Sequence, residues 1–317
     1  MRAVKDQDEV YDVLIVGGGP AGLSAAIWLA RYLHSVVLVD SGDPRNWATR
    51  GVNGFLGHPG IRPAELRAMG RAECRKHGVE LVDAIVETVR RHGNKHFEVR
   101  LESGERLAGR RLLLAIGLRD IWPHIPGLEH VYGKNAHVCP DCDGYECRDR
   151  KTVVIGSGRA AVGLALNLTT WTSDIIICTN GKPPALDREE YCRKLDALNI
   201  PVLTDRVTKV TTTGGAGIYS LELEGGKCLD ADKLFFKLGQ VPADDLAAQL
   251  GCRRDEEGQV IVDDAMHTSV RNVYAAGDIV PGPQLAIAAA ADGAIAALAI
   301  HKSLVPEERK LEKLPSS

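Results

Sequence analysis

Residues 11–40 read YDVLIVGGGPAGLSAAIWLARYLHSVVLVD, and their pattern decides the fold. A short apolar run ends in three glycines, a helical pattern follows from about Pro20 to Leu33, and a second apolar run ends at Asp40. The order is therefore strand, glycine-rich turn, helix and strand. This order is typical of the start of a nucleotide-binding α/β domain.

The turn glycines and the acid that follows them have separate roles in such a domain. Gly17 permits the tight turn, Gly19 lets the backbone approach a pyrophosphate, and Gly22 lets the helix pack close to the strand. The helix start then faces the phosphates with free N–H groups and the positive end of its dipole. Asp40 follows Gly22 by 18 residues, where an acid binds a ribose hydroxyl. Together these residues predict a dinucleotide site.

A second segment with the order strand, glycine-rich turn, helix and strand lies at residues 152–178, TVVIGSGRAAVGLALNLTTWTSDIIIC. Gly156, Gly158 and Ala161 occupy the three turn positions. Both copies are followed by a helical stretch and short alternating strands, and each closes on an apolar run ending in glycine: RRLLLAIG (110–117) and DKLFFKLG (232–239). This internal duplication predicts an α/β protein with two Rossmann-like, three-layer ββα nucleotide-binding domains.

A late segment completes the first domain. Residues 271–278, RNVYAAGD, read as a strand that leads to a glycine and an acid, and a helix rich in small residues follows. We therefore expect a discontinuous first domain, over residues 1–118 and 244–317. The second domain, over residues 123–239, is inserted into it.

Composition excludes several function classes. The net charge of −3 gives no support to a nucleic-acid partner or an anionic membrane surface. The charged N-terminus does not read as a secretory signal, and the apolar stretch 285–300 contains Asp292 and is shorter than a membrane-spanning helix. We expect a cytoplasmic protein that contacts neither nucleic acid nor membrane.

Three of the eight cysteines lie close together in CPDCDGYEC, residues 139–147. A structural zinc site needs four ligands, but a second CxxC is absent from the sequence, so we expect no metal. The alternatives are a pair of inert buried thiols and a redox-active pair. Cysteines at i and i+3 can bridge across one turn, and a helix start there lowers a thiol pKa, which favours the redox-active pair.

The layout resembles the low-molecular-weight thioredoxin reductase family of flavoproteins. The resemblance covers nearly the whole chain. It rests on motifs in the family's order: GGGPAGL (17–23), CPDCDG (139–144), GSGRAAV (156–162), AAGD (275–278) and the final small-residue helix. Residues 43–60 are less like the standard reductases and resemble an offshoot that includes gliotoxin-type dithiol oxidases.

The resemblance implies FAD in the first site. It places these residues at the cofactor: Gly17, Gly19, Pro20, Ala21, Gly22, Asp40, Arg45, Asn46, Asn53, Ala115, Gly117, Gly277, Asp278, Gln284, Leu285 and Ala286. It also implies that Cys142 faces the flavin, that Cys139 attacks the external disulfide, and that Asp143 is the general acid and base. His58 and His137 are further candidates for proton transfer, although a lone histidine is more often a packed or surface residue.

The second site departs from the family pattern. Standard reductases bind the 2′-phosphate of NADPH with a His-Arg-Arg-x-x-x-Arg motif, whereas this chain reads CTNGKPPALDR at 178–188. The occupant is therefore left open between a second FAD, NADPH and none. The residues expected there are Gly156, Gly158, Arg159, Ala160, Thr179 and Asn180.

The sequence thus predicts an FAD-dependent thiol–disulfide oxidoreductase that does not use NADPH efficiently. Its donor would be a ferredoxin or a second flavin, and its substrate a disulfide or dithiol of a thioredoxin-like protein or a small molecule. An oxygen-dependent dithiol oxidase and a non-enzymatic flavin redox sensor are the alternatives. The resemblance also implies a homodimer.

Overall fold

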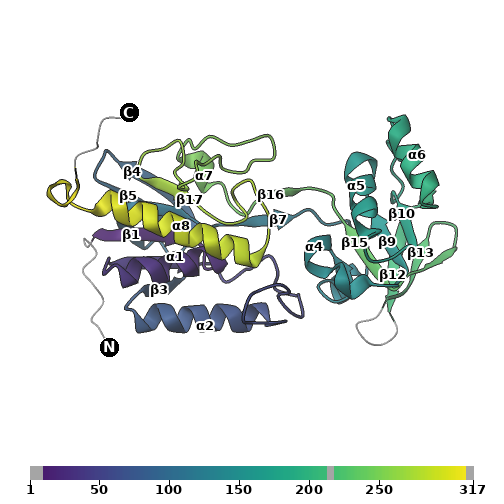
Figure 1. The fold of residues 1–317 in the computed structure, drawn as a ribbon, viewed down its shortest axis with the longest axis horizontal. Coiled ribbons are helices and arrows are strands. Elements are labelled where there is room, and N and C mark those ends of the chain that lie inside the picture. Colours follow the sequence, from purple (N-terminus) through teal and green to yellow (C-terminus); the bar gives the residue numbers. More distant parts are fainter. Residues whose placement is uncertain (1–9, 213–217, 312–317) are drawn as a thin grey trace. The chain divides into compact units, whose positions relative to one another are not determined.

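In the computed structural model the chain is described over residues 10–212 and 218–311. It divides into two compact units, which are described separately here (Figure 1). Unit 1 comprises Met1–Arg45, Ala64–Arg119 and Val241–Ser317. Unit 2 comprises Asn46–Pro63 and Asp120–Gln240.

Unit 1 is built on a seven-stranded sheet with the order β3-β2-β1-β6-β5-β4, in which β17 also pairs with β6. The pairs β3–β2, β2–β1, β1–β6 and β6–β17 are parallel, whereas β5 and β4 form an antiparallel extension of β6. The strands are β1 (Val10–Val16), β2 (Val36–Asp40), β3 (Glu80–Asp83), β4 (Val86–His92), β5 (His96–Leu101), β6 (Arg106–Leu114) and β17 (Val273–Ala275).

Helices α1 (Pro20–Arg31) and α8 (Ala286–Leu304) lie side by side against this sheet (Figure 1). Their approach is close because a Cβ on Gly293 would overlap the carbonyl of Ala21. Within residues 10–212 and 218–311, α8 alone is long and apolar enough to cross a bilayer, which is weak evidence for a span. Its packing against α1 is that of a core helix. Unit 1 also contains α2 (Pro63–Lys76), α7 (Leu246–Gln249) and η2 (Glu307–Arg309).

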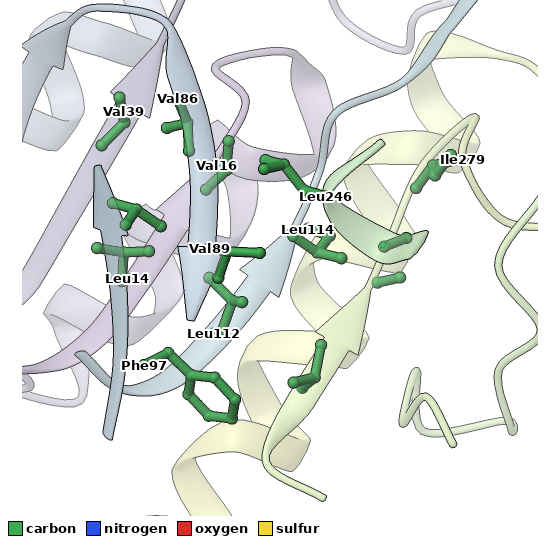
Figure 2. Close-up of a cluster of buried hydrophobic side chains, with 14 of the residues drawn as sticks. Leu14, Val16, Val39, Val86, Val89, Phe97, Leu112, Leu114, Leu246 and Ile279 are labelled. Carbon is green, nitrogen blue, oxygen red and sulfur yellow. The ribbon is translucent and has the colours of Figure 1, made fainter. Parts of the chain in front are cut away.

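The other face of the sheet carries a second apolar core. Figure 2 shows its side chains converging from several strands, from α7 and from the segment after β17. Leu14, Leu112 and Leu114 are fully buried there. Alternate residues of β1 and β6 point to opposite faces, so Val13, Ile15 and Leu113 join the cluster under α1 and α8 instead. A strand buried on both faces needs the continuous apolar runs seen in the sequence.

Unit 2 repeats the plan with a five-stranded parallel sheet, in the order β11-β10-β9-β15-β8, and a three-stranded antiparallel sheet, β12-β13-β14. The order β10-β9-β15 matches β2-β1-β6 of unit 1, and the predicted α/β fold with parallel sheets is confirmed. The strands are β8 (Ala136–His137), β9 (Thr152–Ile155), β10 (Ile175–Cys178), β11 (Val202–Leu203), β12 (Val207–Thr212), β13 (Ile218–Leu223), β14 (Cys228–Asp230) and β15 (Lys233–Phe236).

The helices of unit 2 are short, and the longest of them follows the second glycine turn. They are α3 (Leu128–Val131), α4 (Pro140–Asp143), η1 (Tyr145–Cys147), α5 (Gly158–Leu168) and α6 (Glu189–Ala197). The chain crosses from one unit to the other in β7 (Leu118–Asp120) and in β16 (Gln240–Pro242), and these two strands pair with each other.

The units differ from the predicted domain limits at residues 46–63, which the sequence placed in the first domain. These residues cluster with unit 2. The reason is local packing: the N–H of Arg50 donates to the carbonyl of Gly133 at 3.2 Å, and Trp47 lies 6.4 Å from the ring of Tyr132. A Cβ on Gly133 would overlap the backbone of Ala48. The other domain limits stay a prediction.

Candidate active site

The CxxC motif forms the start of α4. Cys139 is the N-cap residue in an extended conformation, Pro140 follows it, and the N–H of Cys142 donates to Sγ of Cys139 at 3.2 Å. A disulfide joins Cys139 and Cys142, whose Cα atoms are 5.3 Å apart, an ordinary separation for a disulfide. The pair expected from the sequence is therefore brought together within a single turn.

Asp143 ends α4 and lies beside a buried histidine. Its Oδ2 is 3.3 Å from Nδ1 of His137, and both side chains are largely shielded from solvent. The thiol of Cys147 donates to the backbone carbonyl of Asp143 at 3.2 Å. Burial raises the pKa of Cys147 to about 12, so this third cysteine is an inert thiol.

Two neighbours hold the CxxC turn from outside. Asn53 donates from Nδ2 to the carbonyl of Cys142 at 2.9 Å. Gly144 must lack a side chain, because a Cβ there would meet the ring of Trp171 and the carbonyl of Pro140. The contact of Asn53 with the redox motif depends on how residues 46–63 fold back, so sequence spacing could not predict it. The expected contact of Asn53 with FAD stays a prediction.

The first glycine turn lies between β1 and α1. A Cβ on Gly22 would overlap the carbonyl of Gly17, so helix and strand can approach only because this residue is glycine. Among the described residues, no atom lies within 4 Å of where a Cβ of Gly19 would be. Helix α1 begins at Pro20 with no side-chain cap. An open turn that faces an uncapped helix start fits the pyrophosphate of FAD.

Three residues predicted at FAD meet in one cluster. Nη1 of Arg45 donates to Oδ2 of Asp278 at 3.1 Å and to Oε1 of Gln284 at 2.8 Å. Gln259 supports the cluster, since its Nε2 donates to the carbonyls of Asp278 and Val280 at 2.8 and 2.9 Å. The sequence reasoning missed Gln259, because no motif marks a residue that acts through backbone carbonyls far along the chain.

Asp40, the expected ribose ligand, is engaged by arginines of α2. Its Oδ2 accepts from Arg67 and, at 3.4 Å, from Arg71, which also pairs with Asp83 at 2.7 Å. Its Oδ1 accepts from the N–H of Gly42 at 3.2 Å. The carboxylate lies against Gly18 of the turn, so the ribose contact stays a prediction that adds to this ion-pair network.

The other predicted FAD residues are spread over the ends of the same sheet and helices. The N–H of Ala115 donates to the carbonyl of Val16, and the N–H of Gly277 donates to Oδ2 of Asp292 at 3.3 Å. Leu285 is the N-cap residue of α8, and Ala286 is its first residue. Gly117 accepts from the N–H of Ala243 at 3.2 Å. Asn46 belongs to unit 2 with Asn53.

The second glycine turn, between β9 and α5, is arranged differently. The N–H of Gly158 donates to the carbonyl of Pro184 at 2.9 Å, and a Cβ on Gly158 would lie 3.5 Å from the Cβ of Ala185. The loop after β10 therefore already accepts the hydrogen bond of the Gly158 N–H, at the start of α5. Such donors are the ones that a dinucleotide pyrophosphate would need.

Thr179 and Asn180 use their side chains within the same loop. Thr179 is buried and its hydroxyl donates to the carbonyl of Lys182, and Oδ1 of Asn180 accepts from the N–H of Val207 at 2.9 Å. Arg159 and Ala160, on the first turn of α5, are exposed. The residues predicted for a second nucleotide site are thus neighbours, but two of their side chains serve the fold.

The comparisons with known proteins agree with this arrangement. Residues 11–293 match the family described as "Pyridine nucleotide-disulphide oxidoreductase". The chain belongs to this family. It is 31% identical over 280 residues to thioredoxin reductase tcpT of Claviceps purpurea, covering 85% of this chain and 86% of that protein. A crystal structure titled HlmI is 36% identical with a TM-score of 0.88, covering 94% of this chain and 93% of that one.

A further relative is longer than this chain. The match to a probable thioredoxin reductase of Arthroderma benhamiae, 32% identical over 190 residues, covers 58% of this chain and 47% of that protein. Family membership identifies a thioredoxin reductase-like flavin disulfide oxidoreductase and implies FAD as its cofactor. The open first turn and the cluster around Arg45 are the features of this chain that fit FAD.

Proposed function

We propose that the chain is an FAD-dependent thiol–disulfide oxidoreductase that acts through Cys139 and Cys142 and does not use NADPH efficiently. The observation that carries the proposal is the Cys139–Cys142 disulfide at the start of a helix, followed directly by Asp143. The contact between Gly158 and Pro184 supports the second part, because it occupies a donor that NADPH would need.

The chemistry of this chain's own residues is thiol–disulfide exchange. A substrate thiol forms a new S–S bond with Cys139, the Cys139–Cys142 bond breaks, and Cys142 leaves as a thiolate. The thiol proton passes to the Asp143 carboxylate, so atoms and charge balance and no net electrons are transferred in this step. When bound, FAD supplies the two-electron oxidation or reduction of the cysteine pair.

The partners and setting follow the same proposal. The substrate is a disulfide or dithiol of a thioredoxin-like protein or a small molecule. A ferredoxin or a second bound flavin is the electron donor. The enzyme acts as a homodimer in the cytoplasm.

The contact at Gly158 also favours a second candidate, an oxygen-dependent dithiol oxidase. Such an enzyme converts a dithiol and O₂ into a disulfide and H₂O₂, and it needs no nucleotide donor. The occupied second turn suits this direction of electron flow as well as it suits a ferredoxin-linked reductase.

The decisive experiment is the anaerobic visible spectrum of the holoenzyme after addition of NADPH and then of dithiothreitol. We expect NADPH to leave the flavin band unchanged and dithiothreitol to bleach it. Cys142→Ser should slow the bleaching at least about a hundredfold, because the exchange loses its second sulfur. Dithionite serves as the control for reducible flavin.

Each outcome decides one part of the proposal. Rapid bleaching by NADPH would show that the second turn still binds the nucleotide. Equal bleaching of wild type and Cys142→Ser would show that the cysteine pair is not the route. Steady oxygen uptake with dithiothreitol in air would select the dithiol oxidase over the reductase.

A further inference from the structure

His137 lies on the short strand β8, and its neighbours fix the position of its ring. Strand β8 pairs in parallel with β15, in the register that places His137 beside Phe235. The imidazole ring is 5.3 Å from the ring of Phe235 and is almost completely buried. A side chain held by a sheet and an aromatic ring has few rotamers, so its polar atoms point in set directions.

One nitrogen of His137 faces the active site and the other faces the apolar interior. Nδ1 is 3.3 Å from Oδ2 of Asp143, whereas Nε2 is buried and has no hydrogen-bond partner among the residues that the structure describes. An unpartnered buried nitrogen costs free energy, so an apolar side chain would pack better in this place. The histidine is therefore explained by what Nδ1 does for Asp143 rather than by packing.

Two other polar side chains lie near Asp143. The Cys147 thiol donates to the backbone carbonyl of Asp143, and Nζ of Lys233 donates to the carbonyl of Lys134 at 3.2 Å. Lys233 is close enough to Asp143 and Glu146 for their charges to act on it, and burial lowers its pKa. Among the residues that the structure describes, His137 is the side chain with a recorded contact to the carboxylate of Asp143, at 3.3 Å.

We propose that His137 is the positioning residue for Asp143: a proton on Nδ1 holds the carboxylate in one orientation. The inference rests on the proposed function, because it assigns the support of the group that accepts the substrate thiol proton. During exchange, the proton reaches Asp143 while His137 keeps its own proton on Nδ1. A proton on Nδ1 points toward the carboxylate, while Nε2 is buried and has no recorded partner in the described part of the chain.

The test is the anaerobic rate at which dithiothreitol bleaches the flavin of the holoenzyme, measured at about pH 7. Removing the donor leaves the carboxylate free to turn away from the thiol proton, so His137→Leu should slow the reaction about tenfold. His137→Asn should recover most of this loss, because its Nδ2 takes the place of Nδ1.

Two further variants complete the design. His267→Leu removes a histidine of a similar pair in unit 1, 3.0 Å from Asp263, and should leave the rate unchanged. In the double variant His137→Leu/Asp143→Asn the rate should equal that of Asp143→Asn alone, because His137 acts only through Asp143.

No recovery of the rate in His137→Asn would overturn the proposal in favour of packing. Additive losses in the double variant would overturn it as well. If His137→Leu does not fold, His137→Asn against His137→Gln decides, because glutamine moves the donor away from Asp143. A wild-type flavin that dithiothreitol does not bleach would instead contradict the proposed function, and with it this inference.

Discussion

Asp40 and Asp244 are two carboxyl groups with different surroundings. Asp40 is buried against the cations Arg67 and Arg71. Asp244 accepts a hydrogen bond from the N–H of Leu246 at 3.0 Å, and burial raises its pKa to about 6. The carboxylate of Asp40 is therefore paired with cations, whereas burial favours the protonated form of Asp244.

Asp244 predicts a pH dependence of stability. The folded side chain keeps its proton up to about pH 6, and the unfolded one loses it near pH 4. The folded state therefore binds more protons in this window, and its contribution to the free energy of unfolding falls as the pH rises through it. Asp244→Asn should be more stable than wild type by about 1–2 kcal/mol at pH 7.5 and equal to it near pH 4.

Urea unfolding at both pH values measures this difference. Asn keeps the oxygen that accepts from Leu246, so the variant changes the charge and little else. Asp264→Asn, at an exposed carboxyl of unit 1, is the control and should show no comparable gain. A gain of the same size at both pH values would contradict the interpretation.

At the scale of elements, the same strand–turn–helix motif has different surroundings in the two units. In unit 1 the turn between β1 and α1 is open at Gly19. In unit 2 the turn between β9 and α5 donates from Gly158 to Pro184. Both turns have the glycine spacing of nucleotide-binding domains, so the difference lies in the loop that follows the neighbouring strand. We therefore expect that loop to decide which turn can accept a pyrophosphate.

Replacing residues 182–187, KPPALD, with a glycine–serine segment of equal length removes both prolines, and the added backbone freedom should loosen the contact between the carbonyl at position 184 and the Gly158 N–H. One recovered hydrogen bond corresponds to about 1 kcal/mol, so NADPH should bind about fivefold more tightly, as measured by equilibrium dialysis. Adding Gly158→Val should abolish the gain, because valine cannot adopt the φ of +62° found there without strain. Unchanged binding in the loop variant would mean that Pro184 does not limit access.

At the scale of the whole molecule, the eight cysteines divide by burial into reactive and inert groups. Cys139 and Cys142 form the disulfide, and Cys228 is the exposed free thiol. Burial raises the pKa of Cys74 to about 11 and that of Cys147 to about 12. A thiol with a pKa near 12 is about one part in ten thousand thiolate at pH 8, so it reacts very slowly.

Alkylation with iodoacetamide at about pH 8, read by peptide mass spectrometry, tests this division. In the oxidised enzyme Cys228 should react first and the half-buried Cys192 more slowly. Prior reduction should add Cys139 and Cys142, while Cys74 and Cys147 should react only after denaturation. Modification of Cys147 as fast as Cys228 in the folded enzyme would contradict the burial argument.

The local pattern of the chain is enough to predict the α/β fold, the duplicated strand–turn–helix unit and the cysteine pair. Alternation, glycine spacing and the i, i+3 separation are short-range properties, so the sequence carries them directly. The missing NADPH arginines are equally visible in CTNGKPPALDR (178–188).

Only the tertiary structure decided which side chains meet. In the structure, residues 46–63 belong to unit 2, and Asn53 donates a hydrogen bond to the carbonyl of Cys142. Asp40 pairs with the arginines of α2, and the N–H of Gly158 donates to the carbonyl of Pro184. His137 also lies beside Asp143. Hydrogen bonds and ion pairs depend on distances of a few ångströms between segments, and those distances are set by how whole strands, helices and loops pack rather than by residue spacing.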